Sequence, residues 1–95
     1  MKVIYKYELK IDTQQEIYLP KGYNILSVQT QRCVPCLWVE IDKSKEKVPV
    51  KIVTIGTGIE FENNGNLSYI GTYQINAVGL VFHVYEEKTK TKNDE

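Results

Sequence analysis

The 95-residue chain has little alanine and few leucines: one Ala and six Leu stand against ten Val and ten Ile. β-Branched side chains lose rotamer freedom in a helix and pack well on a pleated sheet. A helical protein of this length normally has many more Ala and Leu residues. The seven Tyr point the same way, because aromatic side chains pair across strands. The composition therefore argues for a sheet protein.

The sequence also lacks a long apolar run. No stretch approaches the ~20 residues of a membrane-spanning helix, and Met1–Lys10 does not form the apolar region of a signal peptide. We therefore expect a cytoplasmic protein with reduced Cys residues and no membrane partner. Lys+Arg and Asp+Glu number twelve each, and no basic cluster stands out beyond the loop at Lys43–Lys47. Because nucleic-acid binding needs a basic surface, we expect no such partner.

Metal and redox chemistry lack their usual residues. Cys33-Val34-Pro35-Cys36 is a C-x-x-C motif, but zinc usually needs a second Cys/His pair, and only His83 remains. A redox pair needs a Cys at a helix N-terminus, whereas the residues after Cys36 are strand-like. We interpret the motif as a turn around a proline and expect no metal and no cofactor.

Apolar side chains recur at every second position along much of the chain. This period predicts half-buried strands, separated by turn residues such as Pro20-Lys21-Gly22 and the Asn-Gly pair at 64–65. No segment supports a helix of two turns. The expected strands are Val3–Ile11, Glu16–Leu19, Asn24–Gln31, Leu37–Asp42, Val48–Ile55, a short Ile59–Phe61, Leu67–Ile75 and Leu80–Glu86.

Short strands at this spacing predict an all-β fold, either a small antiparallel sandwich or a partly open barrel of about seven to eight strands. We expect a single domain over residues 1–87 and a disordered polar tail over residues 88–95. In the strand at Leu37–Asp42, Leu37, Val39 and Ile41 should face inward, with Trp38 on the opposite face.

The first candidate binding feature is a glycine-rich turn at the end of an expected strand. The amides of Gly56-Thr57-Gly58 could cradle a phosphate, although no helix follows as in nucleotide-binding loops. The alternative is a bulge or a tight bend at a strand end. Ile55-Gly56-Thr57 recurs as Ile70-Gly71-Thr72, which is too short to establish a repeat.

Two single side chains are also ambiguous. His83 could act as a general base, but no nucleophile with an orienting acid accompanies it. The alternative is a strand His held by a cross-strand polar partner. Trp38 is either an exposed interface anchor or a buried residue of a central strand.

Seven segments of the sequence form one pattern: Lys2–Leu9, Leu19–Gly22, Ile25–Gln29, Cys36–Trp38, Gly56–Gly58, Tyr69–Thr72 and Gly79–Glu86. This pattern, which extends from Lys2 to Glu86, resembles small uncharacterised proteins found mostly in tailed bacteriophages and prophages. That group carries only a domain-of-unknown-function label and no established active site. The resemblance implies a phage accessory gene in a bacterial cytoplasm, where small phage β-proteins often counter host defences by binding.

These observations lead to a functional hypothesis: a non-enzymatic, homo-oligomeric binding protein for a small phosphate-containing, nucleotide-like ligand. Glycine amides would approach the phosphate, Thr hydroxyls would donate, and an aromatic ring would stack on a base. The expected ligand-binding residues are Gly56, Thr57, Gly58, Thr72, Tyr73, Trp38 and His83.

Two alternatives stay open. One is a protein–protein module, either an inhibitor of a host protein or a virion accessory protein, which would use free strand edges and Trp38. The other is a hydrolase built around His83, in which replacement of His83 by Ala would abolish turnover and leave binding intact.

Overall fold

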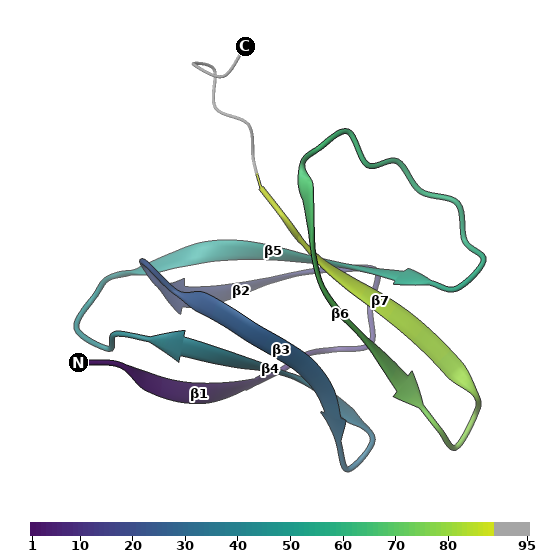
Figure 1. Ribbon diagram of the computed structural model, residues 1–95, viewed down its shortest axis with the longest axis horizontal. Coiled ribbons are helices and arrows are strands. Elements are labelled where there is room, and N and C mark those ends of the chain that lie inside the picture. Colours follow the sequence, from purple (N-terminus) through teal and green to yellow (C-terminus); the bar gives the residue numbers. More distant parts are fainter. Residues whose placement is uncertain (89–95) are drawn as a thin grey trace.

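The computed structural model describes residues 1–88, which form seven antiparallel strands and no helix (Figure 1). The all-β prediction is confirmed, as two packed sheets and not a closed barrel. Over these residues no helix is long and apolar enough to cross a bilayer. Residues 89–95 of the expected polar tail lie outside the described residues. The strands are β1 (Val3–Glu8), β2 (Gln14–Pro20), β3 (Asn24–Gln31), β4 (Val34–Ile41), β5 (Lys47–Gly56), β6 (Leu67–Ile75) and β7 (Leu80–Glu87).

The strands divide into a three-stranded sheet, β1-β4-β3, and a four-stranded sheet, β2-β5-β7-β6. The chain crosses between the sheets after β1, β2 and β4, so neither sheet is built from consecutive strands alone. The edge strands β3 and β6 lie next to each other where the two sheets meet (Figure 1). This contact creates a cleft between two segments far apart in the sequence.

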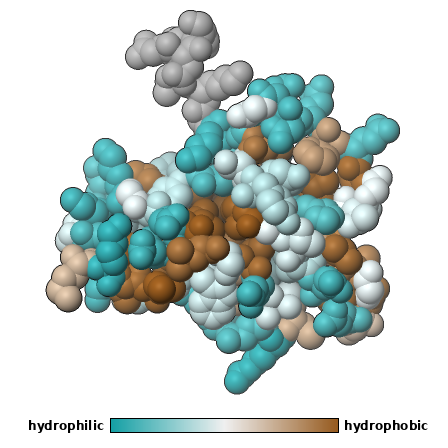
Figure 2. Space-filling view, viewed as in Figure 1, coloured by the Kyte–Doolittle hydropathy of each residue, from teal (hydrophilic) through white to brown (hydrophobic). Residues whose placement is uncertain are grey.

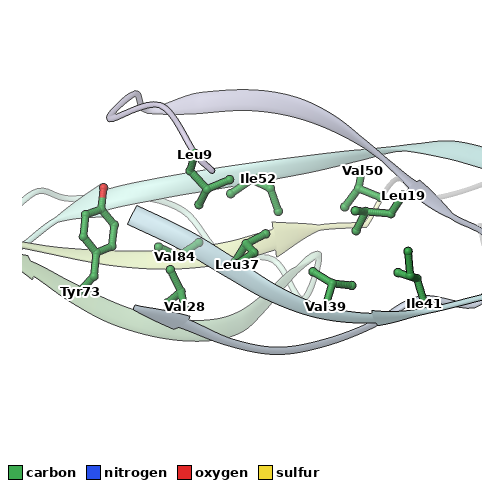
Figure 3. Packing of buried hydrophobic residues seen from close by; sticks show 10 residues of the cluster. All are labelled: Leu9, Leu19, Val28, Leu37, Val39, Ile41, Val50, Ile52, Tyr73 and Val84. Carbon is green, nitrogen blue, oxygen red and sulfur yellow. The ribbon is translucent and has the colours of Figure 1, made fainter. Parts of the chain in front are cut away.

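The core lies between the sheets, and the alternation along β4 shows how it forms. Leu37, Val39 and Ile41 point inward and are fully buried, whereas Trp38 and Glu40 face outward and are half-buried. The predicted inward face of this strand is therefore confirmed. Burying an aliphatic side chain of this size stabilises the fold by about 1.5–3 kcal/mol. Figure 3 shows these side chains packed against Leu19, Val50, Ile52 and Val84 of the other sheet.

Strand β5 is buried on both faces towards its end, as its dense Val and Ile content predicts. Ile52 points into the core between the sheets, and Val53 is buried on the opposite face. That outer face is partly covered by the segment between β5 and β6, where the ring of Phe61 lies 5.7 Å from that of Tyr85. Ile59–Phe61 belongs to this loop, so the expected short strand there is absent.

The region around the C-x-x-C motif differs from the prediction. The interruption lies at Arg32-Cys33, and Pro35 and Cys36 belong to strand β4. Arg32 and Cys33 have φ of 54° and 66°, the left-handed pair of a type I′ hairpin turn. Pro35 is the second residue of the strand, and its carbonyl accepts the Leu9 N–H at 2.8 Å. Cys36 is buried and Cys33 is exposed.

Candidate functional site

His83 occupies a central position in the four-stranded sheet. It lies on β7, with Ile55 of β5 on one side and Thr72 of β6 on the other. The next residue, Val84, is fully buried in the core. Because neighbouring residues of a strand point to opposite faces, the His83 ring lies on the outer face of this sheet.

Both ring nitrogens of His83 are hydrogen-bonded to threonine hydroxyls. Nε2 lies 2.8 Å from Thr57 Oγ1, and Nδ1 lies 2.9 Å from Thr72 Oγ1. Thr72 Oγ1 is in turn hydrogen-bonded to the Tyr69 hydroxyl, at 2.5 Å. We call Tyr69, Thr72, His83 and Thr57 the His83 network. It joins two strands and the loop after β5.

The Val81 carbonyl favours one direction for these hydrogen bonds when His83 is neutral. With the Nε2–H tautomer, Thr57 Oγ1 accepts from Nε2–H and donates its own proton to the Val81 carbonyl at 3.1 Å. Neutral imidazole has only one N–H, so Nδ1 accepts from the Thr72 hydroxyl. Thr72 then accepts from the Tyr69 O–H. This series of hydrogen bonds therefore runs from the exposed Tyr69 hydroxyl to the Val81 carbonyl.

The loop at Gly56–Ile59 holds Thr57 in place for this network. Ile59 N–H donates to Gly56 O at 3.1 Å, and Gly58, the third residue of the turn, has φ +87°, as a type II turn requires. Thr57 N–H donates to Val81 O at 3.2 Å. This amide is already engaged, so the turn acts through the Thr57 hydroxyl and not as an open cradle of amides.

Five of the seven predicted site residues come together here: Gly56, Thr57, Gly58, Thr72 and His83. The other two lie elsewhere. Tyr73 follows Thr72 in β6 and therefore points into the core, where its ring packs on Phe82 at 5.4 Å. Trp38 lies on the outer face of the three-stranded sheet. Neither aromatic can stack on a ligand bound at His83.

Tyr69 takes the place expected for those aromatics. It is 59% exposed, and its ring meets that of Tyr85 edge-on at 5.5 Å. The β6–β7 register shifts between Tyr69 and Gly71, so residues 69 and 72 share a face although their odd spacing places them on opposite faces of a regular strand. The alternation of apolar and polar residues does not reveal this bulge, so the sequence does not identify Tyr69 as a site residue.

Gly71 has a packing role that explains the glycine in the second Ile-Gly-Thr triplet. A Cβ added at Gly71 would lie 2.8 Å from Val28 Cγ1, a distance that real Cβ atoms essentially never show. The glycine therefore allows β6 to approach β3. His83 likewise has the cross-strand polar partner that its structural interpretation expects, because Thr72 lies directly opposite it.

No described carboxylate is hydrogen-bonded to His83, so the network has no orienting acid of the kind used in nucleophilic catalysis. Within residues 1–88 no group of three or more His, Cys, Asp or Glu side chains could hold a metal ion. Comparison with known proteins gives a match over residues 1–95 to a family model described as a domain of unknown function, DUF7352. No curated protein and no solved structure matches the chain.

Proposed function

We propose that this chain, which belongs to the DUF7352 family, is a non-enzymatic protein that binds a small phosphate-containing, nucleotide-like ligand at the His83 network. The proposal includes the setting that the sequence pattern suggested: a phage accessory protein of the bacterial cytoplasm with a counter-defence role. The observation that carries it is the His83 network itself. Residues from β6, β7 and the loop after β5 hold an imidazole between two hydroxyls beside an exposed aromatic ring.

The chemistry of this group suits an anion attached to a planar base. Hydroxyl groups donate to phosphate oxygens, and Tyr69 presents a ring on which a base can stack. Thr57 and Thr72 are exposed and already oriented, so little ordering accompanies binding. None of the four residues of the His83 network is a Lys or an Arg, so the donors to the phosphate are hydroxyl groups.

The Tyr69 hydroxyl is the solvent-facing end of this series of hydrogen bonds. A bound phosphate would accept its O–H in place of Thr72.

Calorimetric titration with AMP, ADP and a cyclic dinucleotide tests the proposal, with adenosine as the phosphate-free control. Tyr69→Phe keeps the ring and removes the outer hydroxyl, so it should weaken binding about three- to tenfold. Tyr18→Phe is the matched control, because Tyr18 is similarly exposed on the same sheet. Absence of binding by every nucleotide to the folded protein would overturn the proposal.

A second candidate function, a protein–protein module, is favoured by one observation. An apolar groove of about 440 Å³ lies beside the Gly56–Ile59 turn, and Ile11 and Ile59 at its rim are each more than half exposed. Such a groove suits an apolar segment of a partner, either a host protein or a second copy in a homo-oligomer. Sedimentation velocity tests the oligomer: Ile59→Lys should shift it to monomer, whereas Tyr69→Phe should not.

A further inference from the structure

A second cavity opens where the two sheets meet, between the starts of β3 and β6. Its volume is about 430 Å³, within the range of small-molecule sites. Residues 22–25, residues 68–70, Glu86 and Lys88 line it. Figure 2 shows hydrophobic residues exposed in a hollow between the positions of β3 and β6 on this face.

Glu86 is the one carboxylate among the buried residues of the described chain, at 9% exposure. It points inward from β7, two residues from the fully buried Val84 and opposite the fully buried Ile52 of β5. A carboxylate at such a position loses hydration that an apolar residue would not need. The carboxylate therefore depends on polar partners at the wall of the cleft.

The partners of Glu86 leave part of the carboxylate free. The Tyr23 hydroxyl donates to Oε2, and burial together with this neighbouring carboxylate raises the pKa of Tyr23, so the phenol remains a donor. The Lys88 ammonium lies 3.6 Å from the same oxygen on a side chain that is largely exposed. Both contacts within residues 1–88 involve Oε2, so Oε1 is available as an acceptor.

We propose that this cleft binds a small organic cation, an alkylammonium or alkylguanidinium, whose charged group pairs with Glu86. Asn24 and Ser68 supply further oxygen acceptors at the wall, and Ile25 and Ile70 contact an alkyl chain. The Lys88 ammonium already occupies the approach to Glu86 and acts as an internal competitor. The cleft shares only Tyr69 with the His83 network, and its ligand has the opposite charge from a nucleotide.

The proposal is tested by titrating the ¹⁵N-labelled full chain with n-butylguanidinium, with butyrate as the control of opposite charge. We expect saturable amide shifts at the starts of β3 and β6 with the cation and none with the anion. Glu86→Gln should weaken binding about tenfold or more, since a hydrogen bond to a charged group is lost. Glu87→Gln is the matched control, because Glu87 lies next in the chain and pairs across from Lys51 on the outer face.

Lys88→Ala gives the outcome that a merely structural Glu86 would not produce. Removing the competing ammonium should tighten cation binding about threefold or more, while the backbone bond from Lys88 N–H to Asn66 O is kept. This arm decides the matter if Glu86→Gln does not fold. No saturable shift with the cation, equal shifts with butyrate, or unchanged affinity in Lys88→Ala would each overturn the proposal.

Discussion

Replacing Tyr73 with Phe removes a buried hydroxyl and leaves the surrounding packing in place. The residue is 3% exposed at one end of the core cluster (Figure 3), and its hydroxyl has no hydrogen-bond partner within residues 1–88. In the unfolded chain the same hydroxyl is hydrogen-bonded to water. Folding therefore loses a hydrogen bond at this position and gains none.

The magnitude follows from that imbalance. A buried polar group without a partner costs about 1–3 kcal/mol, and Phe keeps the ring that packs on Phe82 at 5.4 Å. We expect Tyr73→Phe to raise the free energy of unfolding by about 1 kcal/mol, or the melting temperature by about 4–8 °C for a domain of this size.

Urea unfolding followed by circular dichroism measures this change, with an unchanged m-value showing that the same surface is exposed on unfolding. Tyr18→Phe, on the exposed outer face, should change stability by less than about 0.5 kcal/mol. A loss of about 1 kcal/mol or more in Tyr73→Phe would refute the reasoning, because it would mean that the hydroxyl has a strong partner such as a bound water.

Three further predictions concern stability. In urea unfolding, Gly71→Ala should lower the free energy of unfolding by about 1–3 kcal/mol, because the added methyl group would clash with Val28. In the control variant Gly56→Ala, the added methyl group lies 3.4 Å from its nearest neighbour, so the loss of stability should be smaller. Equal losses in the two variants would contradict this reasoning. Cys33→Gly should raise the melting temperature, with a gain of about 0.5–1 kcal/mol, because the φ of 66° suits glycine; a loss would argue against the turn geometry. The contribution of three tyrosines to stability should be constant below about pH 10 and fall above it, because folding raises their pKa and the unfolded chain releases those protons first. Urea unfolding at several alkaline pH values measures this change, and a stability that rises with alkaline pH would be incompatible. These tyrosines are Tyr7, Tyr23 and Tyr73.

The candidate site was only partly predictable from the sequence. Gly56–Gly58 could be recognised as a turn at a strand end, and His83 as a strand residue with a polar partner. That the turn and the histidine meet depends on the β5–β7 register, which places Gly56 opposite Phe82. Tyr69 joins them only through the bulge in β6. A bulge depends on contacts between strands, so one strand's pattern does not reveal it.

What the sequence determined by itself is the sheet and its alternation. The β-branched composition and two-residue rhythm select extended strands, and the rhythm in β4 determines that Leu37, Val39 and Ile41 share one face, because side chains alternate by backbone geometry alone. Only the tertiary structure decided which strands are neighbours and which faces meet. The tertiary structure places Tyr73 in the core, Trp38 on the opposite sheet from His83, and Glu86 in a buried position beside Tyr23. Each of these three placements depends on contacts between residues far apart in the chain.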